Sequence, residues 1–222
     1  MKNKITITII AYTLFVLVFL YIIEQIRHAP YLIKTIIKLP LFLLLPMALY
    51  KYDFKIKWSM RLHKSDMPLI IFWSVLVFGI IMVAFYVVQP FIGMGNIVSD
   101  ISGRMAVSRN EIVYVGIYTI VVNAFIEELF FRGFIFQGLV KAGWQRLAYV
   151  FSAMTFALYH ISNFRTWFDL WVMALALLGL FIGGIIFAYF VDRTKSFLAS
   201  WLIHMSADIA IVWIGLKIFK VI

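Results

Sequence analysis

The chain contains no cysteine, so disulfide bonds, thiol nucleophiles and cysteine–metal sites are all excluded. It also lacks the His-Glu-x-x-His pattern of helical zinc sites and the Gly-x-Ser-x-Gly elbow of many serine hydrolases. Acidic residues are scarce, with 10 Asp and Glu against 20 Lys and Arg. The few carboxylates that lie in apolar surroundings are therefore the first candidates for function.

Apolar residues dominate what is present, because 64% of the 222 residues are hydrophobic. Runs of about 20 apolar residues, the length of a membrane-spanning helix, recur along the chain. The sequence therefore predicts an all-α protein, a polytopic membrane helical bundle with about seven or eight transmembrane helices. The net charge of +10 comes from bases that lie mostly between the apolar runs. This favours the lipid bilayer as a partner and no nucleic acid.

The expected spans belong to a single membrane-embedded domain, residues 1–222. The N-terminal helices occupy 1–94, and the motif-bearing catalytic core occupies 110–218. Lys34 and Lys38, near the start of the second span, can snorkel to the membrane surface, and Pro40 and Pro46 should kink that helix. The spans run over residues 5–26, 31–50, 68–92, 110–140, 147–161, 169–191 and 196–218. An eighth or re-entrant helix stays open.

The distribution of Lys and Arg predicts the orientation of the bundle. A cytoplasmic N-terminus places more of these residues on the inside than on the outside, as expected for a multi-pass protein of a bacterial plasma membrane. The longest polar connection, 51–67, is interpreted as an anchor at the membrane surface. It carries Lys51, Lys55, Lys57, Arg61 and Lys64.

Three charged residues lie within the apolar run from 112 to 140: Glu127, Glu128 and Arg132. A charge at the centre of a bilayer costs roughly 2.5–3.5 kcal/mol, so these residues call for a specific role. Glu128 and Arg132 are four residues apart and share a helical face, whereas Glu127 points toward the face of Asn123. One carboxylate thus has a built-in partner, and the other is free to act as a general base. A structural ion pair that fixes helix packing is the alternative.

His160, His204 and Asp208 are further ionisable residues inside the later spans. His204 and Asp208 are four residues apart and share a helical face. With a rise of about 1.5 Å per residue, Glu127 and His160 both lie roughly 20 Å from the cytoplasmic ends of their helices. His204 and Asp208 lie roughly 10 and 16 Å deep by the same measure. The sequence predicts that these groups form one buried cluster.

Such a cluster fits hydrolysis of a peptide bond, which needs an activated water and a donor to the oxyanion. Glu127 with His160 can polarise the water, and His204, oriented by Asp208, can donate to the oxyanion. Glu128, tied to Arg132, can set the geometry of the first pair. Alternatively, two His and one Glu can bind Zn²⁺, although no cofactor is the favoured expectation. A serine mechanism based on Ser206 is weaker, because no nucleophile elbow surrounds it.

The three motifs resemble one known family. Glu127-Glu128-x-x-x-Arg132, Phe156-x-x-x-His160 and His204-x-x-x-Asp208 are similar, in this order, to the motifs of the CAAX protease and bacteriocin-processing (Abi) family. This family of multipass intramembrane endopeptidases includes the type II CAAX prenyl endopeptidases. The resemblance covers roughly residues 110–210.

The resemblance implies a glutamate-dependent protease that acts on a membrane-associated peptide or protein. Glu127 and His160 would activate water, His204 and the residue four later would form the oxyanion site, and Glu128 and Arg132 would support them. The eukaryotic prenyl-protein enzymes carry Asn at that last position, whereas this chain has Asp208, which puts prenylated substrates in doubt. Bacterial members are linked to bacteriocin processing, self-immunity and peptide-signal processing.

Two other functions remain open from the sequence. The same cluster could be the packing core of a non-enzymatic membrane immunity or interaction protein. Buried Glu and His also mark ion paths in transporters, but the chain shows no repeated half with a matching broken helix. Aromatic residues near the glutamates are expected to face lipid or to pack against neighbours, with a substrate cleft as the alternative. They are Phe125, Phe130, Phe131, Phe134 and Phe136.

Overall fold

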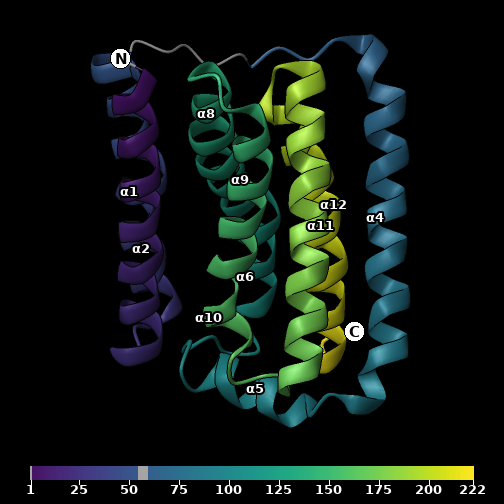
Figure 1. The fold of residues 1–222 in the computed structure, drawn as a ribbon. Coiled ribbons are helices and arrows are strands. Elements are labelled where there is room, and N and C mark those ends of the chain that lie inside the picture. Colours follow the sequence, from purple (N-terminus) through teal and green to yellow (C-terminus); the bar gives the residue numbers. More distant parts are fainter. Residues whose placement is uncertain (1, 55–59) are drawn as a thin grey trace.

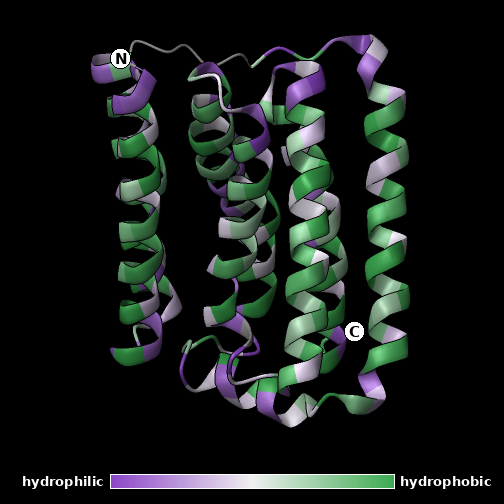
Figure 2. Ribbon diagram, viewed as in Figure 1, coloured by the Kyte–Doolittle hydropathy of each residue, from purple (hydrophilic) through white to green (hydrophobic). Residues whose placement is uncertain are grey.

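The protein is a bundle of long helices (Figure 1). The computed structural model describes residues 2–54 and 60–222, and every regular element in these two stretches is a helix. Apolar residues cover most of the length of the long helices, and hydrophilic residues gather toward their ends (Figure 2). Six helices of the described chain are long and apolar enough to cross a membrane. The predicted all-α, polytopic membrane bundle is therefore confirmed.

The first two spans form one side of the bundle. The span Lys2–Ile26 consists of α1 (Lys2–Tyr21) and a π-helical turn, η1 (Ile22–Ile26). The span Tyr31–Phe54 consists of α2 (Tyr31–Leu39), η2 (Pro40–Leu44), α3 (Leu45–Ala48) and η3 (Leu49–Phe54). The π-helical η2 begins at Pro40, which has no N–H to continue the α-helical hydrogen bonds. The second span thus continues to Phe54, beyond its predicted end at residue 50.

The next span stands at the edge of the bundle. A short 3₁₀ turn, η4 (Lys64–Asp66), leads into α4 (Met67–Val88), which ends in η5 (Gln89–Phe91). Ile70 is the one residue of α4 that is buried, and α4 packs mainly against the last helix of the chain. Helix α5 (Met94–Ser102) then crosses the end of the bundle (Figure 1). Of the bases predicted in the connection before α4, Lys55 and Lys57 lie outside the described residues.

The central span carries the predicted glutamates and alternates between α-helical and π-helical segments. It consists of α6 (Ile112–Tyr118), η6 (Thr119–Asn123), α7 (Ala124–Glu128), η7 (Leu129–Phe136) and α8 (Gln137–Lys141). The segments η6 and η7 are π-helical, and they flank the short helix α7, which carries both glutamates. Because a π-helix has more residues per turn, the side chains before and after α7 are rotated relative to a regular helix. Such segments occur frequently at functional sites.

The fifth predicted span is a short, interrupted helix. Helix α9 (Gln145–Tyr159) has 15 residues, fewer than the roughly 20 that cross a bilayer. It ends at a turn at His160 and continues as α10 (Ile161–Phe164). In Figure 1, α9 starts at the end of the bundle near the N-terminus, and α10 lies toward the end covered by α5. This broken segment is not among the six spans, so the described residues hold one span fewer than the seven listed from the sequence.

The chain closes with two regular helices, α11 (Leu170–Thr194) and α12 (Phe197–Ile218). The Ser196 side chain caps α12 by accepting a hydrogen bond from the backbone N–H of Leu198. Helix α11 packs closely against α9 at Gly184, where an added Cβ would lie 2.8 Å from the Cα of Ala153. This contact fixes α9, and with it His160, against the rest of the bundle.

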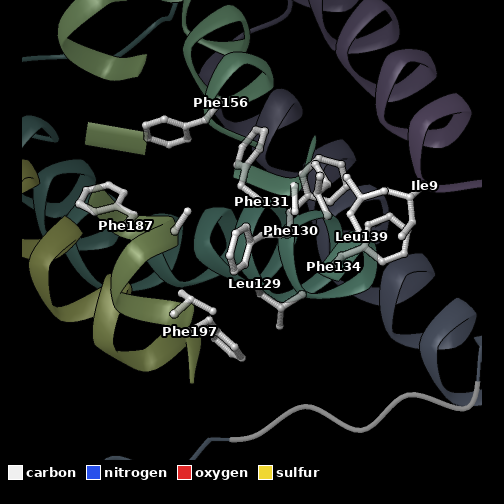
Figure 3. Close-up of a cluster of buried hydrophobic side chains, with 14 of the residues drawn as sticks. Ile9, Leu129, Phe130, Phe131, Phe134, Leu139, Phe156, Phe187 and Phe197 are labelled. Carbon is white, nitrogen blue, oxygen red and sulfur yellow. The ribbon is translucent and has the colours of Figure 1, made fainter. Parts of the chain in front are cut away.

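Aromatic side chains of the central span fill the core. Phe130, Phe131, Phe134 and Phe136 are fully buried. Figure 3 shows Phe131 beside Phe156, a residue of α9, within one apolar cluster. Because these side chains have almost no exposed surface, they pack the interior. The packing interpretation is confirmed for these four side chains, whereas Phe125 is only partly buried and packs against the rings of Phe197 and Trp201.

Candidate active site

Side chains from three separate segments converge inside the bundle. Glu127 Oε2 lies 3.9 Å from His160 Nε2 and 3.9 Å from His204 Nε2. Asp208 Oδ1 lies 3.7 Å from His204 Nε2. The structure therefore brings together the residues that the depth estimate placed in one cluster. The side chains of His160 and Asp208 keep 14% and 15% of their surface exposed, whereas that of Glu127 keeps 4%, so the accessible surface of the cluster lies mainly on His160 and Asp208.

Glu127 is not the free carboxylate that the sequence suggested. Lys38 Nζ donates a 2.7 Å hydrogen bond to Glu127 Oε1. Asn123 Nδ2, one helical turn before Glu127, donates a 2.8 Å hydrogen bond to the same oxygen. The expected neighbour on the Asn123 face is therefore present, but a lysine from α2 forms an ion pair with the carboxylate. The other oxygen, Oε2, faces the two imidazoles.

The prediction that Lys34 and Lys38 snorkel to the membrane surface is wrong. Both lysines are buried. Lys34 Nζ lies 2.7 Å from Glu24 Oε2, and Lys38 pairs with Glu127 as described. Each lysine meets a carboxylate of another helix, and a paired charge is less costly to bury than a lone one. The prediction was wrong because it considered only the lysine and the lipid, and not a carboxylate partner within the protein.

His160 is held in a defined orientation by the end of α9. Its Nδ1 lies 2.8 Å from the backbone carbonyl oxygen of Phe156, four residues earlier. A carbonyl oxygen only accepts hydrogen bonds, so Nδ1 carries the hydrogen. In the neutral ring, Nε2 is then the acceptor nitrogen, and it is this atom that faces Glu127 Oε2. The turn after Tyr159 thus places a hydrogen-bond acceptor beside the carboxylate.

His204 is oriented by Glu128, not by Asp208 as predicted. Its Nδ1 lies 3.0 Å from Glu128 Oε1, whereas the Asp208 carboxylate is 3.7 Å from the opposite nitrogen. The i,i+4 spacing correctly placed Asp208 near His204. It could not show that Glu128, on another helix, makes the shorter hydrogen bond. Glu128 therefore supports the second imidazole and fixes its Nε2 toward Glu127.

Arg132 completes the support behind Glu128. Its Nη1 donates a 3.0 Å hydrogen bond to Glu128 Oε1, and both side chains have no exposed surface. The guanidinium lies 4.3 Å from the ring centre of Phe156 and 5.0 Å from that of Phe187. The predicted Glu128–Arg132 pair is therefore present. Glu128 Oε1 accepts from both Arg132 and His204, and so couples the ion pair to the imidazole.

Two further predictions concern Asp208 and Ser206 on α12. Asp208 Oδ2 is buried and has no hydrogen-bond partner within the described chain, which leaves it open to a group that enters the cluster. Ser206 Oγ donates a 2.6 Å hydrogen bond to the carbonyl oxygen of Ser74 on α4. The hydroxyl thus ties two helices together, and this arrangement does not favour a serine nucleophile.

The zinc alternative finds no support in the geometry. Among residues 2–54 and 60–222, no three His, Asp or Glu side chains have the spacing of a metal site. Lys38 also places a positive charge 2.7 Å from Glu127 Oε1, where a metal cation would be repelled. Hydrolysis without a cofactor remains a prediction.

Lys38 is the functional candidate that sequence reasoning missed. One signal was available, because an ionisable residue inside a membrane span calls for a partner by default. Two lysines four residues apart within one apolar span, together with unpaired glutamates elsewhere, indicate buried pairs. The sequence could not tell which lysine meets which glutamate, since Lys38 and Glu127 are 89 positions apart.

Comparison with known proteins agrees with this geometry. Residues 109–210 match the family described as Type II CAAX prenyl endopeptidase Rce1-like. This range contains every site residue predicted from the sequence, from Glu127 to Asp208. Neither a curated protein nor a solved structure matches the chain. The resemblance drawn from the three motifs is therefore confirmed by a match to the Rce1-like type II CAAX prenyl endopeptidase family over residues 109–210.

Proposed function

We propose that the protein is an intramembrane, glutamate-dependent endopeptidase that hydrolyses a membrane-associated peptide or protein without a cofactor. One observation carries the proposal: Glu127 Oε2 lies 3.9 Å from the Nε2 atoms of both His160 and His204. Atoms at this separation do not hydrogen-bond directly, but both can contact one water molecule at about 2.8 Å. The match to an endopeptidase family supports the same class of reaction.

Glu127 serves as the general base in this proposal. Its Oε2 takes a proton from the water as the water oxygen adds to the carbonyl carbon of the scissile bond. His160 Nε2 accepts a hydrogen bond from the same water and orients it. The protonated Glu127 then gives the proton to the amide nitrogen. The C–N bond breaks, and a new carboxyl group and a new amine leave.

His204 stabilises the oxyanion that forms on the carbonyl oxygen. Glu128 holds Nδ1 at 3.0 Å, and the carboxylates of Glu127 and Asp208 face Nε2 at 3.9 and 3.7 Å. These acidic neighbours favour an imidazolium, which carries hydrogens on both nitrogens and can donate from Nε2. A donor fixed in advance at the developing charge is typically a major contribution to catalysis.

The finer assignment of the substrate follows from Asp208. An ionised carboxylate cannot donate to an oxyanion as the Asn of the eukaryotic prenyl-protein enzymes can. We therefore extend the proposal to peptide precursors of a bacterial plasma membrane, such as bacteriocins or peptide signals, in preference to prenylated proteins. In the proposed topology the N-terminus is cytoplasmic, since this places more Lys and Arg inside.

The experiment uses the purified protein in proteoliposomes with membrane-associated peptides that become fluorescent on cleavage. Glu127→Gln and His160→Ala should each abolish cleavage while the protein still folds. Glu24→Gln is the matched control, because Glu24 is also buried and paired with a lysine but lies outside the cluster. Full cleavage by the Glu127 and His160 variants would exclude the proposal.

A non-enzymatic membrane immunity or interaction protein is the second candidate. The deep burial of Glu127 and its ion pair with Lys38 are also features of a packing core. In that case Glu127→Gln would retain the biological phenotype. Arg132→Ala would lose both the fold and the phenotype, and no membrane peptide would be cleaved by the native protein.

A further inference from the structure

Lys38 and Asn123 form a closed ring of hydrogen bonds with Glu127. Lys38 Nζ donates to Glu127 Oε1 and to Asn123 Oδ1, both at 2.7 Å. Asn123 Nδ2 donates to Glu127 Oε1 at 2.8 Å. Both donors contact the same carboxylate oxygen, so the carboxylate cannot rotate without losing two hydrogen bonds. Oε2 is therefore the oxygen directed at the imidazoles.

The position of the Lys38 ammonium group is itself restricted. The Lys38 side chain is 4% exposed, and its Nζ lies 5.0 Å from the ring centres of both Phe42 and Tyr159. Aromatic faces attract a cation, most strongly where water is excluded. Two rings, one amide and one carboxylate thus surround the ammonium group, and α2 is held against the central span at this point.

A second ion pair on α2 provides an internal comparison. Lys34 lies one turn before Lys38 and pairs with Glu24 at 2.7 Å. Glu24 also accepts a 2.7 Å hydrogen bond from Ser162 and lies 3.5 Å from Arg104. Both lysines are buried and both join helices, yet only Lys38 contacts the carboxylate that faces the two histidines. A purely structural role would make the two lysines equivalent.

We propose that Lys38 is a positioning residue of the endopeptidase site, which holds Glu127 ionised and directs Oε2 at the water to be activated. The proposal rests on the endopeptidase function inferred above. It assigns a role to a residue of the N-terminal helices, outside residues 109–210 that match the family. Lys38 does not touch the substrate. It acts only through Glu127.

The proposal predicts a change in the pH dependence of cleavage. Removal of the positive charge takes away an attraction that favours the ionised Glu127 carboxylate, since an opposite charge within about 4–6 Å stabilises the ionised form. The other charged or titratable groups that interact with Glu127 remain in place; they include Tyr31, Tyr118, Arg132, Tyr159, His160, His204 and Asp208. The acid limb of the rate profile should therefore move to higher pH in a Lys38 variant.

The test compares Lys38→Met, Lys38→Gln, Lys38→Arg and Lys34→Met in proteoliposomes, with a membrane-associated fluorogenic peptide. Lys38→Met and Lys38→Gln should lower kcat by about 10- to 100-fold, by analogy with loss of the hydrogen-bonded partners that orient metal ligands, while KM should stay close to the native value. In both variants the acid limb of the rate profile should lie at higher pH than in the native protein. Lys38→Arg should restore part of kcat and the native pH profile. Lys34→Met should keep the native pH profile.

Native pH profiles and native kcat in the Lys38→Met and Lys38→Gln variants would overturn the proposal. Thermal unfolding in detergent shows which variants fold, and if Lys38→Met does not, the smaller change in Lys38→Gln decides. Glu127→Gln separates the two claims. Cleavage by Glu127→Gln at the native rate would reject the assignment of Glu127 as the base, and no cleavage by the native protein would reject the endopeptidase function itself. Loss of cleavage in Glu127→Gln, together with native behaviour of the Lys38 variants, would reject only the role of Lys38.

Discussion

Arg132→Met removes the cation that supports Glu128. Arg132 and Glu128 have no exposed surface and are joined by a 3.0 Å hydrogen bond. The methionine fills part of the space of the arginine but leaves a buried carboxylate with His204 as its remaining partner. The cost is the energy of a buried, poorly compensated charge, so the effect should be large for a single substitution.

The expected loss of stability follows from the distance between the two charged groups. With an effective dielectric constant of about 20, two unit charges 3.0 Å apart attract by roughly 5 kcal/mol. Measured losses on breaking a buried ion pair by removing one partner are about 3–5 kcal/mol. The guanidinium also loses its contact with the Phe156 ring, 4.3 Å away. We expect Arg132→Met to lower the free energy of unfolding by about 3–5 kcal/mol.

The assay is reversible denaturation in mixed micelles, followed by tryptophan fluorescence. Arg193→Met is the matched control, because Arg193 lies 3.9 Å from Asp66 with half of its side chain exposed, and exposed pairs contribute only about 0–1 kcal/mol. The double variant Glu128→Leu/Arg132→Met should recover part of the loss, since it removes the unpaired charge. If Arg132→Met is no less stable than Arg193→Met, the buried pair does not support the site as argued.

Three further predictions concern packing, the oxyanion site and pH. Gly184→Ala should lower the free energy of unfolding by about 1–3 kcal/mol, because its Cβ would lie 2.8 Å from an α9 backbone atom. Gly179→Ala is the control and should be neutral, because a Cβ at Gly179 would have nothing within 4 Å. Equal stabilities of the two variants in thermal unfolding would contradict the close packing of α11 against α9. Asp208→Asn should retain cleavage and Asp208→Leu should lose it, since only a polar group can assist His204; steady-state kinetics will show whether the Leu variant remains active. Burial raises the pKa of Asp100, but the hydrogen bonds from Arg104 and Trp167 outweigh this and hold the pKa below its usual value. This contribution to stability is present above about pH 4 and is lost as pH falls further, so Asp100→Asn should weaken the acid dependence of unfolding; an unchanged dependence would contradict the assignment.

The sequence predicted the parts of the site that depend on short-range spacing. The four-residue interval between Glu128 and Arg132 correctly indicated an ion pair, and the interval between His204 and Asp208 correctly placed them together. Hydropathy gave the depth of each residue, and similar depths on separate helices were enough to predict the convergence of Glu127 with the two histidines. These inferences need only the rise and the period of a helix.

The contacts between helices could not be predicted. The pairing of Lys38 with Glu127, and of His204 with Glu128, depends on which faces of distant helices meet. The π-helical segments η6 and η7 add to this difficulty, because they rotate the faces on either side of α7 away from the regular period. No spacing rule in the sequence shows where the backbone changes from α-helical to π-helical hydrogen bonds.

The turn at His160 is a second feature of the site that the sequence did not predict. A hydropathy run over 147–161 predicted a continuous short span, whereas α9 ends at Tyr159 and the chain turns at His160 before α10. The turn matters for the chemistry, because it leaves the imidazole at a helix end with Nε2 directed at Glu127. A histidine one turn earlier in α9 would lie on nearly the same face but about 5.4 Å away along the helix axis.

Hydrolysis in water enriched in heavy oxygen tests the central claim most directly. The purified protein in proteoliposomes is incubated with a membrane-associated peptide, and mass spectrometry follows the new carboxyl terminus. The account predicts that the native protein and Glu24→Gln form a product with one heavy oxygen atom in that carboxyl group, and that Glu127→Gln forms none. A labelled product from Glu127→Gln at the native rate would contradict the assignment of Glu127 as the base that activates the water.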